Sequence, residues 1–346
     1  MTSRTKKIIT LAVSAVVSIL LIGILISRIE TRDLVRTIRD IHRPALAAYI
    51  AAALAGAGLR AWRYKILLHP RTISWPDILM VTFIRNSFVD LLPARIGSLS
   101  FILIMNRRLG FPFESATSAF LASLVLDFIT LGPFVILAAA VVGLGTSPLA
   151  SPILAGLGAA FSAVFIIILI ELPRFIDLFT SVFGKVLSLF RLDARAWAVM
   201  FREKLRATSL SLKDLKKRRI DIPLFGLSFL IRGAKYAALS FLVLALLHSH
   251  GVSFAEFGFF KLILGVTGAE LTSVLPVKGL AGFGTWEAAW ALTFSLMGID
   301  EGLAIISGLG VHLLTNVFEY SLGIASLIIL LFPWLRRSAR RKPEET

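Results

Sequence analysis

Six long apolar runs constrain what this chain can fold into more than any other feature of its sequence. They occupy residues 8–27, 44–67, 114–142, 150–170, 222–247 and 303–331. Each run is long enough to cross the hydrocarbon core of a bilayer as a helix, which takes about 20 apolar residues. Only 17% of the residues are charged, whereas a soluble domain carries about 25%. We therefore expect an all-α, polytopic helical membrane protein, and we exclude a soluble enzyme, a disordered chain and a disulfide scaffold.

Two further apolar segments are interrupted by proline, glycine and charged residues. They cover residues 78–105 and 254–297. In the first, Pro93 stands two residues before Arg95, and in the second Pro276 stands two residues before Lys278. Proline and glycine break helices, and an interrupted backbone at membrane depth is tolerated only inside protein or beside a watery cavity. If each segment enters and leaves on the same side, the topology is six full spans plus two re-entrant broken-helix hairpins.

The basic residues beside the apolar runs predict the orientation, because cytoplasmic loops carry an excess of Lys and Arg. The formal net charge of the chain is +16. Most of the excess lies in the first seven residues, in the polar stretch 171–221 and in the C-terminal tail. These regions, and hence both termini, are predicted to be cytoplasmic, and 171–221 is interpreted as an amphipathic linker on the membrane. Anionic lipids account for this charge, so nucleic acid is not an expected partner.

The two halves of the chain share a pattern that predicts an inverted repeat inside a single membrane domain, residues 1–346. Arg60–Tyr64 (RAWRY) resembles Arg232–Tyr236 (RGAKY), and the two proline loops correspond. The predicted repeats are residues 45–142 and 222–333. Each reads span, broken hairpin, span, with Asp127 and Glu319 in the closing spans. Under the predicted orientation the repeats run in opposite directions through the membrane, which is typical of transporters.

Charged side chains inside the apolar segments are the candidate functional residues, because each costs about 2.5–3.5 kcal/mol at the bilayer centre. They must therefore face one another, water or a ligand. The cations, with the prolines and glycines of the broken segments, are predicted to bind an anionic headgroup: Arg60, Arg63, Pro93, Arg95, Arg232, Lys235, Pro276, Lys278, Gly279 and Gly282. Four acids and one histidine are predicted to balance that charge or to carry a coupling proton: Asp127, Glu270, Glu287, His312 and Glu319.

Structural roles compete with these predictions. An ion pair such as Arg60 with Asp127 would lock the helix bundle, and Arg63 could instead extend to the lipid headgroups. His312 shares one helix face with Glu319, which fits an interhelical polar cluster as well as a proton relay. The sequence contains no motif for nucleotide, zinc or acyl-transfer chemistry, and without cysteine it has no thiolate. We therefore expect no cofactor, no metal site and no enzymatic activity.

Several short motifs share the order and spacing of a known group of membrane proteins. They are Leu92–Gly97 (LPARIG), Arg107–Gly110 (RRLG), the lone acid Asp127, and Gly279–Gly284 followed by Glu287. Together they resemble the lysylphosphatidylglycerol synthase transmembrane region, also called the flippase-like family, over nearly the whole chain. The chain differs from the usual family pattern at Ser98, Phe101 and His312. The resemblance implies movement of a lipid across the bilayer, and members are linked to aminoacylated phosphatidylglycerol, polyprenyl-linked sugars and hopanoid lipids.

We predict a lipid transporter or flippase that moves an anionic phospholipid or polyprenyl-linked lipid between leaflets, through a cavity at the repeat interface. The expected partners are membrane lipids and a lipid synthase or glycosyltransferase. The resemblance implies a place in the bacterial inner (cytoplasmic) membrane. Two alternatives stay open: an integral membrane enzyme that modifies a lipid headgroup, and a non-catalytic membrane partner of a lipid synthase, anchored by residues 171–221.

Overall fold

The described part of the chain is helical. The computed structural model describes residue 16 and residues 18–91, 97–143, 150–218, 221–252, 257–272 and 282–332, and these ranges contain no strand. Within them, five helical segments are long and apolar enough to cross a membrane: Arg43–Leu68, Phe113–Val142, Gly156–Leu189, Ile222–His250 and Glu301–Leu331. The described part of the first predicted run, Ser18–Ser27, is a shorter apolar helix. The prediction of an all-α, polytopic membrane protein is confirmed.

The chain divides into two compact units that alternate along the sequence. The first unit consists of Met1–Ala55, Met80–Ser100 and Ala234–Thr346, and the second of Gly56–Leu79 and Phe101–Gly233. Helices α3 (Arg43–Leu68), α4 (Trp75–Leu91) and α10 (Asp221–Leu247) contribute residues to both. Each unit therefore gathers residues that are far apart in the sequence.

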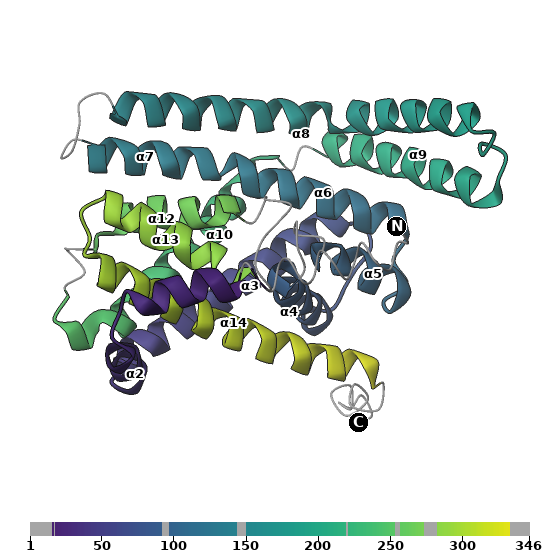
Figure 1. Cartoon of the computed structure of the whole chain (residues 1–346). Helices are drawn as coiled ribbons and strands as arrows, with labels where there is room; N and C mark the ends of the chain where they lie inside the picture. The colour runs from purple at the N-terminus through teal and green to yellow at the C-terminus, as the bar shows by residue number, and fades with distance from the viewer. Residues whose placement is uncertain are drawn as a thin grey trace. The chain divides into compact units, whose positions relative to one another are not determined.

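The second unit is built on long antiparallel helices. These are α6 (Phe113–Ile129), α7 (Leu131–Gly143), α8 (Ala150–Leu189) and α9 (Ala196–Lys217). The break between α6 and α7 is explained by Pro133, which lacks the N–H that would bond the Ile129 carbonyl. Helix α8 runs alongside α6 and α7, and α9 returns alongside α8 and α6 (Figure 1). Val125 of α6, Leu172 of α8 and Leu212 of α9 belong to one buried apolar cluster.

Helix α8 continues past the point where its apolar run ends. The sequence predicted a span over residues 150–170, whereas the helix passes through Pro173 and ends at Leu189. Proline removes one backbone donor from a helix and crowds the preceding turn. At this turn α9 supplies side-chain donors, Ser209 Oγ to the Pro173 carbonyl at 3.2 Å and Lys216 Nζ to the Ile170 carbonyl at 3.3 Å. Contacts with α9 thus stabilise the part of α8 that carries the proline.

The first unit packs short helices against one long one. Its helices include α2 (Thr31–Arg39), the 3-10 turn η2 (His248–His250), α12 (Phe259–Leu271), α13 (Thr285–Leu296) and α14 (Glu301–Leu331). Helix α13 packs on both α12 and α14, and α2 contacts α14 (Figure 1). Trp290 and Phe294 of α13 are fully buried, and the Trp290 indole donates to Ser307 Oγ of α14 at 3.1 Å. These contacts fix α13, which carries one of the predicted site residues.

Both interrupted segments contain helices on either side of the interruption. Helices α12 and α13 have 13 and 12 residues, so each extends about 20 Å and is too short to cross a core of roughly 30 Å. In the other segment α4 ends at Leu91 and α5 (Ser100–Arg107) begins nine residues later. Five predicted site residues lie outside the described residues: Pro93, Arg95, Pro276, Lys278 and Gly279. The re-entrant path and the inverted repeat therefore stay predictions.

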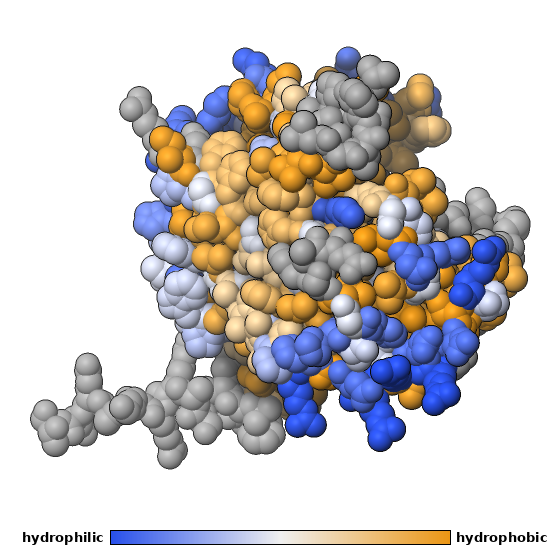
Figure 2. All heavy atoms as spheres, turned by 90° about the vertical axis from the view of Figure 1, so that its left-hand side faces the viewer, coloured by the Kyte–Doolittle hydropathy of each residue, from blue (hydrophilic) through white to orange (hydrophobic). Residues whose placement is uncertain are grey.

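Hydrophobic side chains, drawn in orange, cover much of the face that Figure 2 shows. Large apolar residues on the outside of long helices include Leu157 and Ile167 of α8 and Ile324 of α14, all more than half exposed. Exposed apolar surface of this extent marks a site of contact with protein or membrane. On the spanning helices, this surface is what a bilayer would cover.

Candidate functional site

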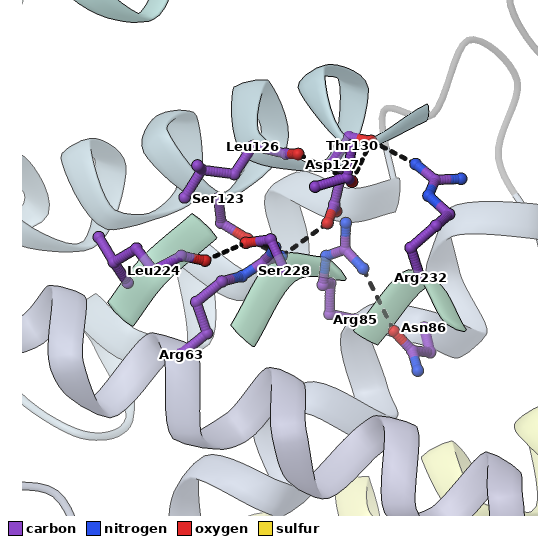
Figure 3. A network of polar contacts seen from close by, with 10 residues as sticks. All are labelled: Arg63, Arg85, Asn86, Ser123, Leu126, Asp127, Thr130, Leu224, Ser228 and Arg232. Atoms are coloured by element: carbon purple, nitrogen blue, oxygen red, sulfur yellow. Dashed lines mark hydrogen bonds and ion pairs between the residues drawn. The ribbon is translucent and has the colours of Figure 1, made fainter. Parts of the chain in front are cut away.

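Arg63, which is buried, and Asp127, which is partly buried, form an ion pair in the second unit (Figure 3). Arg63 comes from α3, and its Nη2 lies 2.8 Å from Asp127 Oδ1 of α6. The same nitrogen donates to Ser123 Oγ at 2.7 Å, and Nη1 donates to Ser228 Oγ at 2.9 Å. The arginine side chain is 0% exposed. One guanidinium therefore links α3 to α6 and to α10 within this unit.

The local sequence explains this arrangement. Ser123 and Asp127 are four residues apart and so lie on one face of α6. The guanidinium of Arg63 donates from two separate nitrogens, Nη1 and Nη2, whereas a lysine has a single ammonium nitrogen. The suggestion that Arg63 extends to the headgroups is wrong, because its side chain is enclosed and bonded. The sequence suggested Arg60 as the partner of Asp127. The structure shows an ion pair between Asp127 and Arg63, which lies three residues further along α3. Arg60 itself is half-buried.

Arg232 reaches the same turn of α6. Its Nη2 donates to the backbone carbonyl of Asp127, which also accepts a bond from Thr130 Oγ1 at 3.2 Å (Figure 3). Asp127 lies two residues before the last residue of α6, where carbonyls lack intrahelical donors and the helix dipole attracts cations. Two of the predicted cations, Arg63 and Arg232, thus meet the lone acid of this span from two helices.

A second ion pair joins Lys235 of α10 to Glu270 of α12, in the first unit. The lysine side chain is 38% exposed and the glutamate 17%. Arg63, by comparison, is completely enclosed. The structure therefore brings together a predicted headgroup ligand and a predicted charge-balancing acid, and more than a third of the lysine side chain stays exposed.

A third pair, Glu287 of α13 and His312 of α14, lies in the core of the first unit. Glu287 Oε1 is 2.6 Å from His312 Nδ1, and Glu287 is fully buried. Its other oxygen, Oε2, accepts the backbone N–H of Gly284 at 2.7 Å. Gly284 precedes the first residue of α13 with a φ of +88°, a conformation that glycine adopts readily. Glu287 therefore caps its own helix and binds the neighbouring one.

Aromatic rings enclose the imidazole of His312. Its ring centroid lies 4.5 Å from that of Phe283 and 4.9 Å from that of Trp286. Gly282, predicted to bind a headgroup, is buried beside this ring with a φ of +84°. The structure thus places Gly282 with the buried Glu287–His312 pair.

Glu319 and His312 have different neighbours, although they share a face of α14. The backbone carbonyl of Glu319 accepts a hydrogen bond from Ser87 Oγ of α4 at 2.5 Å, within the first unit. Its side chain is half-buried. His312, in contrast, bonds to α13. The face predicted as a polar cluster or relay therefore contacts two different helices.

Outside the apolar spans, Arg218 caps the C-terminus of α3 in the second unit. Its Nη2 donates to the Ile66 carbonyl at 2.9 Å and its Nη1 to the His69 carbonyl at 2.6 Å. Partial burial lowers the pKa of the Arg218 guanidinium, because desolvation disfavours its charged form. The cation supplies donors to carbonyls that the helix end leaves unbonded.

Some partners were not predicted. Ser123 stands four residues before Asp127, and Ser228 stands four residues before Arg232, so helical spacing from a predicted charge was the available signal. Trp286 directly precedes Glu287. Within the ranges that the structure describes, no three His, Asp or Glu side chains lie close enough together to hold a metal ion.

Long apolar helices that carry paired charges define a multi-pass integral membrane protein. The family described as the lysylphosphatidylglycerol synthase TM region matches residues 8–323, and the chain belongs to it. The resemblance drawn from the short motifs is thereby confirmed, and the protein is related to lipid metabolism. No curated protein and no solved structure matches the chain.

Proposed function

We propose that this protein moves an anionic phospholipid or polyprenyl-linked lipid between the two leaflets of the membrane. Family membership supports a role in lipid metabolism. The more specific claim rests on one observation, the partly exposed ion pair between Lys235 and Glu270 on two apolar helices. A cation that lipid can reach within an apolar helix is a natural ligand for a negatively charged headgroup.

The ion pair suits an exchange of partners. An unpaired lysine at the bilayer centre costs about 2.5–3.5 kcal/mol, so Glu270 holds the charge of Lys235 when no lipid is bound. A phosphate oxygen also accepts charge-assisted hydrogen bonds from an ammonium group. A headgroup that replaces Glu270 therefore keeps Lys235 paired throughout. Arg63, which is enclosed, suits a structural role instead.

Transport against a gradient would need a source of energy. The sequence contains no nucleotide-binding motif, which leaves an ion gradient, a partner protein or the lipid gradient itself. We propose the buried pair of Glu287 and His312 as the site of a coupling proton, since a carboxylate oxygen and an imidazole nitrogen 2.6 Å apart can share one. The predicted roles of Arg95 and Lys278 at the headgroup belong to the same proposal.

The location and the partner are also proposals. We propose the bacterial inner membrane, with both termini in the cytoplasm, on the basis of the family and of the basic residues that flank the apolar runs. A lipid synthase or glycosyltransferase that makes or uses the transported lipid is the proposed partner.

The test is reconstitution of the purified protein into vesicles that carry fluorescent lipids. A panel of headgroups would include phosphatidylglycerol, a polyprenyl phosphate and zwitterionic phosphatidylcholine, and a membrane-impermeant quencher would report exchange between leaflets. We expect faster exchange of the anionic lipids than in protein-free vesicles. Absence of exchange for every headgroup would contradict the proposal, and a chemically altered headgroup in the recovered lipid would instead indicate an enzyme.

A further inference from the structure

The hairpin of α8 and α9 in the second unit contains a polar groove that has no part in the proposed lipid transport. The groove has a volume of about 570 Å³. Lys185 of α8 and Arg202 and Arg206 of α9 line it, together with the hydroxyl groups of Ser181 and Ser188. Arg202 and Arg206 are four residues apart, so both present their guanidinium groups on one face of α9. The groove therefore gathers cations and hydroxyl donors from two helices.

Positive charge prevails in this groove. Two carboxylates also line it, but Asp177 is bound by Lys213 Nζ at 2.9 Å, which compensates its charge. Asp193 then faces three cationic side chains, none of which forms an ion pair within the part of the chain that the structure describes. Such a set of donors attracts an anion that can accept several hydrogen bonds, and a phosphate group does so with three or more oxygens.

The guanidinium group of Arg202 packs against α8 at Gly184. A Cβ atom at Gly184 would lie 3.3 Å from Arg202 Cζ, so the absence of a side chain at this position leaves room for the guanidinium. The Nε of Arg202 is buried and has no hydrogen-bond partner among the described residues. The guanidinium is thus held in the groove, but its Nε–H donates no hydrogen bond to the described residues. A buried donor without a partner raises the free energy of the folded state.

The sequence of α8 predicts that the groove lies near the membrane surface. Residues 150–170 contain no charge and are enough to cross the hydrocarbon core, and charges begin at Glu171. The groove begins about 10 Å further along the helix, which predicts a position at the level of the headgroups. An exposed apolar stripe on α8, with Phe175, Phe179 and Val182, keeps this part of the hairpin in the interface rather than in water.

We propose that the groove between α8 and α9 binds the phosphate of an anionic lipid headgroup at the membrane surface. This lipid is a bound ligand of the hairpin and need not be the lipid that is transported. The inference therefore stands whether or not the proposed transport is correct.

The chain contains no cysteine, so a single introduced thiol can report on the groove. Ser181→Cys places the thiol in the lining, and Ala194→Cys places one at an exposed position of the nearby loop. The full-length protein is placed in lipid nanodiscs, and the rate of modification by an uncharged maleimide is measured. The discs contain phosphatidylcholine alone, phosphatidylcholine with phosphatidic acid, or phosphatidylcholine with inorganic phosphate in the buffer.

We expect phosphatidic acid to slow modification of the cysteine at 181 severalfold and to leave the cysteine at 194 unchanged. Arg202→Gln with Arg206→Gln should abolish this protection. The control, Arg174→Gln with Lys217→Gln, removes the same charge from exposed surface pairs and should keep the protection. Equal slowing at both cysteines, no slowing at 181, or protection that survives loss of both groove arginines would overturn the proposal. Protection by inorganic phosphate but not by phosphatidic acid would overturn the assignment to a lipid.

Discussion

Glu287 Oε1 and His312 Nδ1 lie 2.6 Å apart and join α13 to α14 in the core of the first unit. The same carboxylate caps α13 through the Gly284 N–H. This one side chain therefore serves both the start of a helix and its packing against the next. Its loss would leave two polar groups buried without their partner, and we expect the stability of the first unit to depend on it.

Glu287→Leu should lower the free energy of unfolding by about 3 kcal/mol, from the lost pair and the lost cap. Glu287→Gln keeps an acceptor oxygen and should cost less. Equilibrium unfolding in mixed detergent measures both. Glu301→Ala is the control, because Glu301 belongs to an exposed pair with Arg28 that contributes little. The structural role assigned to Glu287 is wrong if its leucine variant is no less stable than this control.

Arg63→Met should cost about 3 kcal/mol, because the partly buried Asp127 carboxylate loses the cation that binds it. Arg63→Lys should cost about 1.5–3 kcal/mol, since an ammonium cannot replace bonds from two separate nitrogens. Adding Asp127→Leu to Arg63→Met should restore part of the stability. A double-mutant cycle of the unfolding free energies measures this coupling, and strictly additive losses would argue against a direct pair.

Gly323→Ala should destabilise the first unit by about 1–3 kcal/mol. A Cβ atom there would lie 1.8 Å from Ser87 Oγ and 3.2 Å from the Phe83 carbonyl, so α14 and α4 would have to move apart. Gly226→Ala is the matched control, because a Cβ on that helical glycine would have no neighbour within 4 Å. It should raise stability by up to about 1 kcal/mol through helix propensity. Thermal unfolding measures the stability of both variants. Equal changes in stability would contradict the close approach of α4 and α14.

The spans could be predicted from sequence because a run of about 20 apolar residues is long enough to cross the bilayer as a helix, and hydropathy identifies such a run directly. The end of α8 could not, because the helix past Pro173 is stabilised by donors from α9 that are more than 30 residues away. A local pattern contains no information on such contacts. The interruption between α12 and α13, in contrast, could be predicted from Pro276 and the glycines within the segment itself.

The candidate charges could also be predicted, since ionisable residues are rare inside apolar segments. Their partners were harder to predict. Helical spacing identifies the face of α3 that carries Arg60 and Arg63, but only packing decides which of them is enclosed beside Asp127. Similarly, His312 and Glu319 share a face in the sequence, yet one bonds to α13 and the other contacts α4.

The central claim is that Lys235 receives an anionic headgroup during movement of lipid between leaflets. The most direct test compares leaflet exchange of phosphatidylglycerol and phosphatidylcholine by the wild type and by the double variant Lys235→Gln with Glu270→Gln, which removes both charges together. Lys217→Gln serves as a control for lost surface charge. We predict that the double variant exchanges phosphatidylglycerol at least about tenfold more slowly, the equivalent of one lost charge-assisted bond, and that exchange of phosphatidylcholine is unchanged. Exchange of phosphatidylglycerol at the wild-type rate by the folded double variant would contradict the account.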